Sequence, residues 1–296
     1  MNCKKLALSL SLALLLSMST AFAQTAYTFE TINYSGDTFT QLLGINNDGI
    51  IAGYHNFNLN SGFTYDQETK VFTTENYPDS MQTQVIGINN NGAKTSGFFI
   101  SQSNVTEGFT DNQGTFTAVN FPGSAFNQLL SQNDEGQAAG YYSLSASGAP
   151  DVPYVYDEFG GIFEVINIPN SVNAQATGIN DAGDVVGFFC DSTGAMHGWL
   201  LEGGYFYQLD DPQGKGTTAA LGLNNKGLVV GSYVDTDNNT HGFVYTISSK
   251  TWQTIDDPNG KGNTIVNGVN DKGTLVGFYG PQACGTNDCT GFIAKE

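Results

Sequence analysis

The stretch Gly44-Ile45-Asn46-Asn47-Asp48-Gly49 decides the fold, because copies of it recur along the chain. The six copies begin at residues 44, 87, 131, 178, 222 and 268, which places them 43, 44, 47, 44 and 46 residues apart. The third copy, Ser131-Gln132-Asn133-Asp134-Glu135-Gly136, is degenerate. A regular period of this length indicates one structural unit repeated six times.

Each copy carries the same landmarks after its turn. A second glycine is followed in most copies by an aromatic residue, as in Gly53-Tyr54, and a glycine–aromatic pair comes later, as in Gly62-Phe63. Short runs of β-branched and aromatic residues alternate with polar ones, and Gly, Asn, Asp or Pro bounds each run, which is typical of strands. We therefore expect four strands, a to d, in repeats that begin near residues 41, 84, 128, 175, 219 and 265. The Asn-x-x-Gly turn would join a to b as a tight hairpin.

The two ends of the chain divide one repeat between them. The sixth repeat stops at Glu296, directly after its third strand, while residues 29–34 carry the pattern of a strand d. Pairing of residues 29–34 beside residues 290–294 would close a ring and leave no unpaired edge in that blade. The sequence thus predicts an all-β, six-bladed β-propeller with four antiparallel strands per blade, the last blade closed by the N-terminal strand.

The first residues have the pattern of an export signal. Lys4 and Lys5 precede an apolar run over residues 6–16, and Ala21-Phe22-Ala23 resembles a cleavage site. We expect a signal peptide over residues 1–23 and a single propeller domain over residues 24–296. No apolar stretch reaches the roughly 20 residues of a membrane span. The protein is therefore expected to be secreted, extracellular or periplasmic, without a membrane span, and monomeric.

The charge balance excludes one class of partner. The formal net charge is −18, and the sequence contains no arginine. Loss of Lys4 and Lys5 leaves eight lysines against 28 acidic residues, a charge near −20 (8 − 28). Nucleic-acid binding needs Lys and Arg to neutralise phosphates, so we expect none. The acidity favours solubility and allows affinity for cations.

Three cysteines remain after cleavage. Cys284 and Cys289 fall in one loop and are close enough to form a disulfide, which export permits. Cys190 is then the odd one, either a small buried apolar side chain or a free thiol.

Two repeats carry a further motif, His197-Gly198-Trp199 and His241-Gly242-Phe243, besides the Gly-Ile-Asn turns. In these features the chain resembles the HAF-repeat extracellular proteins, a family of exported bacterial proteins, over nearly all of residues 29–296. The resemblance implies a secreted β-propeller and implies no established activity.

The connections differ in a way that predicts a working surface. The a–b and c–d hairpins are short and uniform, and we call their side of the ring the turn face. The b–c and d–a connections are longer and differ between repeats, and they should emerge on the opposite side, where recognition is expected. We call this side the loop face; it includes residues 55–61, 142–152, 190–197, 210–217, 234–240, 256–263 and 280–290.

The candidate ligand-binding residues lie in or beside these connections: His55, Asn58, Tyr141, Tyr142, His197 and His241. His197 and His241 occupy equivalent places one blade apart, too far for one metal ion. A structural hydrogen bond at the start of strand c is the favoured interpretation, and a ligand or general-base role is the alternative. The recurring turn asparagines are expected to stabilise their own turns.

Two acidic motifs have competing interpretations. Asp235, Asp237 and Asn239 have the alternating spacing of a calcium loop but lack its glycine and its distal glutamate, so a solvated polar loop is the favoured interpretation and a calcium site is the alternative. Asp210-Asp211 and Asp256-Asp257 could suggest an acid–base pair. However, neighbouring residues of a strand point to opposite faces, so a turn is the better interpretation.

No nucleophile elbow, phosphate loop, zinc signature or dinucleotide fingerprint occurs in the sequence. We expect a secreted, non-enzymatic binding module that recognises an extracellular carbohydrate or protein surface through the loop face, with no cofactor other than calcium. The alternative is a hydrolase or lyase that acts on an extracellular polymer. An enzyme should gather unlike ionisable residues at one place, whereas a lectin should repeat one pocket around several blades.

Overall fold

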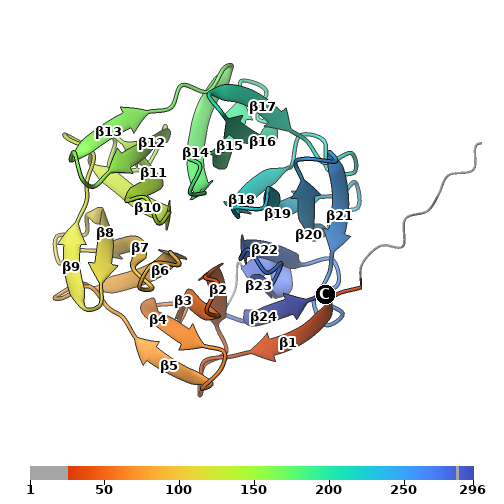
Figure 1. Ribbon diagram of the computed structural model, residues 1–296, viewed down its shortest axis with the longest axis horizontal. Coiled ribbons are helices and arrows are strands. Elements are labelled where there is room, and N and C mark those ends of the chain that lie inside the picture. Colours follow the sequence, from red (N-terminus) through yellow and green to blue (C-terminus); the bar gives the residue numbers. More distant parts are fainter. Residues whose placement is uncertain (1–25, 285–286) are drawn as a thin grey trace, which may run out of the picture.

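The computed structural model describes residues 26–284 and 287–296, so the expected signal peptide lies outside the described residues. Within the described part, strands form six four-stranded antiparallel sheets, and one short 3-10 helix is present. The sheets stand around a central axis like the blades of a propeller (Figure 1). The predicted fold class is confirmed.

Each blade is a simple meander whose innermost strand is strand a. In blades 1 to 3, strands a to d are β2 (Thr40–Ile45), β3 (Ile50–His55), β4 (Ser61–Asp66) and β5 (Val71–Thr74); β6 (Gln82–Ile88), β7 (Thr95–Ile100), β8 (Thr106–Asn112) and β9 (Thr115–Ala118); and β10 (Phe126–Gln132), β11 (Gln137–Ser143), β12 (Val152–Asp157) and β13 (Ile162–Val165).

Blades 4 to 6 repeat this order. Their strands are β14 (Ser171–Ile179), β15 (Val185–Asp191), β16 (Met196–Glu202) and β17 (Tyr205–Leu209); β18 (Ala219–Leu223), β19 (Leu228–Val234), β20 (Thr240–Thr246) and β21 (Thr251–Ile255); and β22 (Thr264–Val269), β23 (Leu275–Tyr279), β24 (Thr290–Lys295) and β1 (Thr28–Ile32). The helix η1 (Pro281–Cys284) belongs to the b–c loop of blade 6.

The recurring glycines are required by close packing. A β-carbon on Gly53 of strand b would lie 2.3 Å from the carbonyl oxygen of Gln41 and 2.8 Å from the ring of Phe63. The aromatic residue of strand c thus packs directly over the glycine of strand b. These strand-c aromatics are 0% exposed in every blade: Phe63, Phe109, Tyr154, Trp199, Phe243 and Phe292. Burying a side chain of this size contributes roughly 2–3 kcal/mol.

The turn asparagines hold their own turns and also connect neighbouring blades. Asn46 Oδ1 accepts hydrogen bonds from the backbone nitrogens of Asp48 and Ile50, as expected for a turn. Its Nδ2 donates to the carbonyl oxygen of Asn89 in the next blade. The residue after each asparagine completes a ring, in which the backbone nitrogen of one residue donates to the side-chain oxygen of the next: Asn47, Asn90, Asp134, Asp181, Asn225, Asp271 and again Asn47. The sequence predicted the turns but not these bonds between blades.

The ring is closed by β1, which pairs with β24 in the sixth blade (Figure 1). The register places Phe29 opposite Ala294 and Ile32 opposite Gly291, so the predicted closure is confirmed. The strand is shorter than residues 29–34, because it ends at Ile32 and Tyr34 instead stacks on His55. Strand β5 is likewise short and ends at Thr74.

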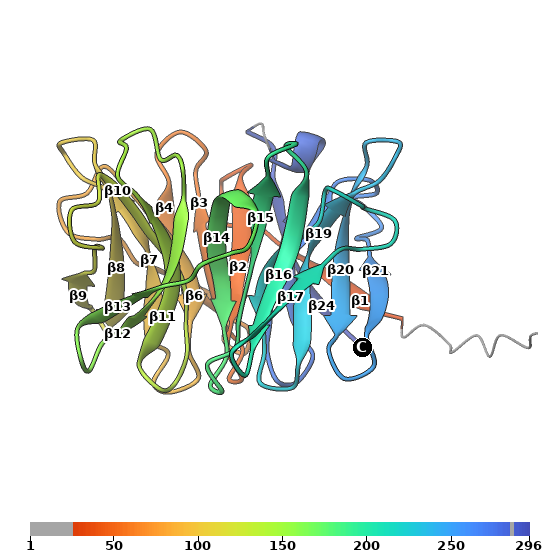
Figure 2. The ribbon, with the colours of Figure 1, turned by 90° about the horizontal axis from the view of Figure 1, so that it is seen from above.

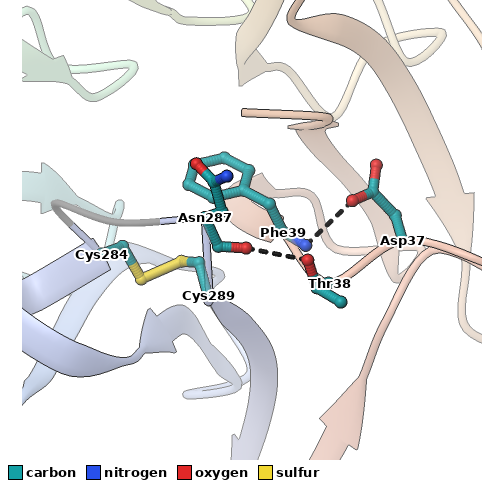
Figure 3. Close-up of a disulfide and its surroundings, with 6 residues drawn as sticks. All are labelled: Asp37, Thr38, Phe39, Cys284, Asn287 and Cys289. Atoms are coloured by element: carbon teal, nitrogen blue, oxygen red, sulfur yellow. Dashed lines mark hydrogen bonds between the residues drawn. A yellow bond between two sulfur atoms is a disulfide. The ribbon is translucent and has the colours of Figure 1, made fainter. Parts of the chain in front are cut away.

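A disulfide lies beside the seam, which is the place where β1 closes the ring (Figure 3). Cys284 and Cys289 are bonded, as predicted, and both are buried beside Phe39. The backbone nitrogen of Cys289 donates to the carbonyl oxygen of Thr38, and Thr38 Oγ1 donates to the carbonyl oxygen of Asn287 at 2.8 Å. The loop of the last blade is therefore fixed against the segment that leads into the first blade. Cys190 is a free, half-buried thiol.

Candidate functional site

The b–c and d–a connections emerge on one side of the ring, the upper side in Figure 2, and the short hairpins emerge on the other. The loop face is acidic: among the described residues it carries two lysines, Lys215 and Lys261. The aspartates on this face are Asp37, Asp79, Asp151, Asp191, Asp210, Asp211, Asp235, Asp237, Asp256, Asp257 and Asp288. An excess of one charge favours partners of neutral or opposite charge and repels anionic ones.

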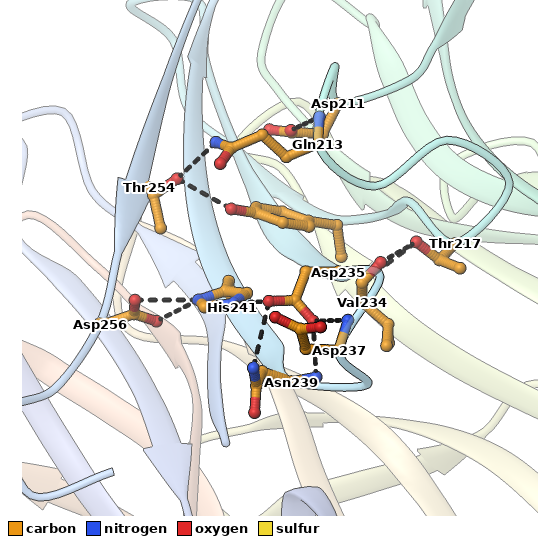
Figure 4. Close-up of polar contacts among 11 residues, drawn as sticks. Asp211, Gln213, Thr217, Val234, Asp235, Asp237, Asn239, His241, Thr254 and Asp256 are labelled. Carbon is orange, nitrogen blue, oxygen red and sulfur yellow. Dashed lines mark hydrogen bonds and ion pairs between the residues drawn. The ribbon is translucent and has the colours of Figure 1, made fainter. Parts of the chain in front are cut away.

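His241 lies between two carboxylates at the start of β20 (Figure 4). Its Nδ1 is 2.9 Å from Asp256 Oδ2, its Nε2 is 3.1 Å from Asp235 Oδ2, and its ring stacks on Tyr233. Burial acts to lower the pKa of His241, but the hydrogen bonds with Asp256 and Asp235 outweigh it and raise the pKa. When both nitrogens donate, neither can accept a proton, so the residue connects the b–c loop to strand d rather than serving as a general base.

His197 repeats this arrangement one blade earlier. Its Nδ1 is 2.8 Å from Asp210 Oδ1, and its Nε2 is 3.6 Å from Asp191 Oδ2. The two histidines thus belong to separate networks, each with its own aspartates. In blade 2 the corresponding position holds Glu107, which accepts a hydrogen bond from Asn120. A carboxylate–amide contact in blade 2 is therefore replaced by a histidine–aspartate pair in blades 4 and 5.

His55 differs from the other two because it lies on strand b, at the end of β3. Its Nδ1 is 2.9 Å from Asp37 Oδ2, and its ring lies 3.6 Å from that of Tyr34 in a parallel stack. Burial acts to raise the pKa of Asp37, but the hydrogen bond and charge of His55 and the backbone hydrogen bonds from Phe39 and Thr38 together outweigh it and lower the pKa. The contact connects the d–a segment before blade 1 to its second strand.

The calcium candidates form a compact turn. Asp235 Oδ1 accepts hydrogen bonds from the backbone nitrogens of Asp237 and Asn239, and its Oδ2 accepts from Asn239 Nδ2 and lies beside His241. The backbone hydrogen bond from Asn239 is the main reason that the pKa of Asp235 falls to about 2. A calcium ion would have to displace these donors. Over residues 26–284 and 287–296 no group of three or more His, Cys, Asp and Glu side chains is placed to hold a metal ion, and calcium binding stays a prediction.

The paired aspartates separate as the strand geometry predicts. Asp210 and Asp256 face the histidines, whereas Asp211 and Asp257 are buried, at 1% and 0% exposed. Asp211 Oδ1 accepts a hydrogen bond from the backbone nitrogen of Gln213 and so caps the following turn. Burial raises the pKa of Asp211 and of Asp257.

The predicted tyrosines are engaged inside the fold. Tyr141 is 6% exposed, and its hydroxyl donates to Gln128 Oε1 at 2.7 Å. The ring of Tyr142 stacks on Phe121 with centroids 3.7 Å apart. Both side chains therefore make contacts within the fold. Asn58 is exposed in the b–c loop of blade 1, where its carbonyl oxygen accepts a hydrogen bond from Gln82.

Sequence reasoning missed a set of exposed apolar side chains on the loop face of blades 1 to 4, which we call the apolar patch. It consists of Phe57, Leu59, Met81, Val105, Leu144 and Val172, which are 40, 61, 40, 38, 72 and 55% exposed. These exposed residues could have been noticed in the sequence, because each is an apolar residue within or beside a polar connection. Clustered apolar side chains exposed to water are a mark of interaction surfaces.

Hydrogen bonds show that the first part of this patch is continuous. Gln82 Nε2, one residue after Met81, donates to the carbonyl oxygen of Asn58, which lies between Phe57 and Leu59. The backbone nitrogen of Met81 in turn donates to the carbonyl oxygen of Ile100, at the start of the loop that holds Val105. The loops of blades 1 and 2 and the segment between them therefore form one surface.

The described part of the protein also contains two cavities, one along the axis and one on the turn face. A channel of about 90 Å³ follows the axis and is lined by the a strands and the ring of turn residues. A larger cavity of about 340 Å³ opens between blades 2 and 3 and is lined by residues of the turn face, among them Lys94 and Glu158.

Comparison with known proteins supports the fold. No protein-family model and no curated protein matches the sequence. Among solved structures, the chain is similar to TolB from Acinetobacter baumannii, with a TM-score of 0.56 and 11% identity over 88% of this chain. The match spans 65% of that TolB chain. A mutant of Aleuria aurantia lectin in complex with Fucalpha1-6GlcNAc gives a TM-score of 0.52 and 9% identity, covering 88% of this chain and 95% of the lectin.

The β-propeller domain of the Trilobed protease from Pyrococcus furiosus gives a TM-score of 0.51 and 11% identity, covering 83% of this chain and 79% of that one. At such identities the likeness shows the fold alone. The protein is a six-bladed β-propeller. The resemblance to HAF-repeat proteins stays a prediction. Among the described residues, no helix has the length and apolar character needed to cross a membrane.

Proposed function

We propose that this protein is a secreted interaction module that binds an extracellular protein surface through the apolar patch of the loop face. One observation carries the proposal, namely the exposed apolar side chains of the patch, which lie on connections that differ between blades. Interface centres combine apolar side chains with a polar rim. Here Leu59 and Met81 would supply the apolar centre, and the aspartates around them would supply the rim.

The alternatives have less support. Sugar recognition through the predicted tyrosines would require open rings, but the ring of Tyr141 is buried and that of Tyr142 stacks on Phe121. Hydrolysis would require an available acid or base, and His241 has a carboxylate at each ring nitrogen. Asp211 and Asp257 have raised pKa values, but they are buried under the turns that they cap.

Binding to cells of the producing organism tests the proposal. The labelled mature chain is titrated onto washed cells and their envelope fraction, before and after treatment with protease. The double variant L59S/L144S removes two side chains of the patch. V71S/I162S is the matched control, because Val71 and Ile162 are 53% and 60% exposed on outer d strands. Substitutions at such exposed positions should change the free energy of unfolding by less than ~0.5 kcal/mol each.

We expect saturable binding that protease abolishes, that L59S/L144S weakens at least about tenfold, and that V71S/I162S leaves unchanged. Equal binding by both double variants would contradict the role of the patch. Binding that survives protease but is lost after glycosidase treatment would contradict a protein partner, and the absence of saturable binding would contradict the interaction itself.

A further inference from the structure

The cavity between blades 2 and 3 lies on the turn face, opposite the apolar patch, so it is a separate candidate site. Its volume of about 340 Å³ falls at the lower end of the ~300–1,000 Å³ typical of small-ligand pockets. The cavity is lined by polar side chains and one aromatic ring, among them Asn91, Lys94, Asn112, Gln137, Glu158 and Phe159.

The cavity coincides with a local departure from the repeat. In the first blade the backbone nitrogen of Asn46 donates to the carbonyl oxygen of Ile50, four residues later, and the turns of blades 3 to 6 keep this spacing. In blade 2 the nitrogen of Asn89 donates instead to Lys94, five residues later. The added residue places Ala93 at a φ of 54°, in the left-handed region that non-glycine residues rarely adopt. Strained backbone of this kind occurs often at binding sites.

A second departure lies on the facing blade. At the end of strand a, five blades carry an apolar residue, Ile45, Ile88, Ile179, Leu223 or Val269. Blade 3 carries Gln132, whose Nε2 donates to the carbonyl oxygen of Lys94. The amide thus holds the lengthened turn in place beside the cavity.

An ion pair spans the two blades at this point. Lys94 Nζ of blade 2 contacts Glu158 Oε2 of blade 3, and the two side chains are 19% and 29% exposed. The pair offers a strong donor and a strong acceptor in one place, and the amides of Asn91, Asn112 and Gln137 add further donors and acceptors around it.

Phe159 gives the cavity an apolar rim. Its side chain is 81% exposed although it lines the cavity. A β-carbon on Gly136 would lie 2.4 Å from its ring, so the ring rests against that glycine. A flat aromatic ring held in this way can pack against the C–H face of a sugar ring.

From these features we propose that the cavity binds a neutral saccharide, one or two sugar rings in size. Sugar hydroxyls both donate and accept, which matches the ammonium, carboxylate and amide groups, and Phe159 supplies the apolar contact. Lys94 and Glu158 balance one another, and Asp134, which also lines the cavity, adds a negative charge that disfavours phosphorylated or acidic sugars.

The test uses the mature chain and a panel of glucose, galactose, mannose, N-acetylglucosamine, maltose and cellobiose, with glucuronate and glucose 6-phosphate as charged counterparts. Saturation-transfer NMR at about 10 mM sugar detects binding in the millimolar range and below, and calorimetry gives the dissociation constant. F159A removes the ring and E158Q removes the carboxylate charge. Y205A is the matched control, because Tyr205 is 71% exposed on β17 of blade 4 and does not line the cavity.

At least one neutral sugar should bind, and F159A and E158Q should each weaken it about tenfold while Y205A leaves it unchanged. F159A and Y205A should have the same thermal unfolding temperature, because removal of the exposed Phe159 side chain should leave the fold intact. The proposal is overturned if no neutral sugar gives saturation transfer, if F159A binds as tightly as Y205A, or if a charged sugar is preferred. Binding of F159A to cells reports separately on the loop face, so failure at one site leaves the other test intact.

Discussion

Replacing Ile32 by alanine tests whether the N-terminal strand holds the ring as firmly as a strand within a continuous blade. Ile32 is 7% exposed and packs with Leu42, Phe63 and Ile293 across the seam. Its equivalent in blade 5 is Ile255, which is 2% exposed, because each faces the glycine of strand c in the register. Truncating a buried isoleucine to alanine costs ~2–5 kcal/mol, so about 3 kcal/mol is expected for each variant.

The assay is urea unfolding followed by circular dichroism, with thermal unfolding alongside. In a domain of this size, a loss of about 3 kcal/mol should lower Tm by about 6 °C. If β1 completes the blade, I32A and I255A should be destabilised to within about 1 kcal/mol of one another, in one cooperative transition. An I32A variant within ~0.5 kcal/mol of the wild type, beside an I255A variant that loses the expected amount, would refute closure by β1.

Three further predictions concern the seam and the ionisable groups. Reduction of the Cys284–Cys289 disulfide should lower the free energy of unfolding by about 2 kcal/mol, as measured in urea with and without dithiothreitol. An unchanged unfolding midpoint would show that the disulfide does not stabilise the closed ring. Burial raises the pKa of Glu75 to about 7, so the carboxyl ionises in the unfolded chain before it does so in the folded one, and stability should fall as pH rises from about 4.5 to about 7. E75Q should remove that fall and gain about 1–3 kcal/mol at pH 8, and an E75Q profile parallel to the wild type would contradict this assignment. The raised pKa of His241 predicts stability that is complete below pH 6.5 and lost as pH rises through the raised value, and H241Q should lack this loss when unfolding is measured from pH 5 to 9.

The repeat architecture could be predicted from the sequence because its recurring residues are required by local structure within each blade. A turn needs an asparagine that bonds its own backbone, and strand b needs a glycine where the ring of Phe63 packs. Such requirements recur in every blade and are visible in one sequence. Pairing of β1 with β24 was predictable for the same reason, since residues 29–32 carry the pattern of the other d strands.

Contacts between repeats were harder to predict. The bond from Asn46 Nδ2 to Asn89 and the ring of side chains after it depend on how blades are placed around the axis, which no local pattern encodes. The partners of His241 lie within its own blade, in the b–c loop that precedes it and at the end of strand d, and were also not predicted. The sequence did carry one clue, because aspartate replaces asparagine at that end in the two blades that have the histidine.

The candidate surfaces were predictable in location rather than in detail. The loop face followed from the variable connections, but Tyr141 and Tyr142 are used in packing, and the apolar patch was missed because single apolar residues in loops are common. The sugar cavity lies on the turn face, which appeared uniform. One added residue in the turn of blade 2 and Gln132 in the facing blade distinguish it.

Photocrosslinking from the apolar patch tests directly whether this surface binds a protein partner. A benzophenone amino acid replaces Leu59 of the patch in one chain and Ile162 of an outer strand in another, and each chain is irradiated on cells of the producing organism. If the patch binds a protein, a discrete crosslinked protein is expected from position 59, suppressed by an excess of unlabelled wild-type chain, and none is expected from position 162. Equal crosslinking from both positions, or none from position 59, would contradict binding through the patch.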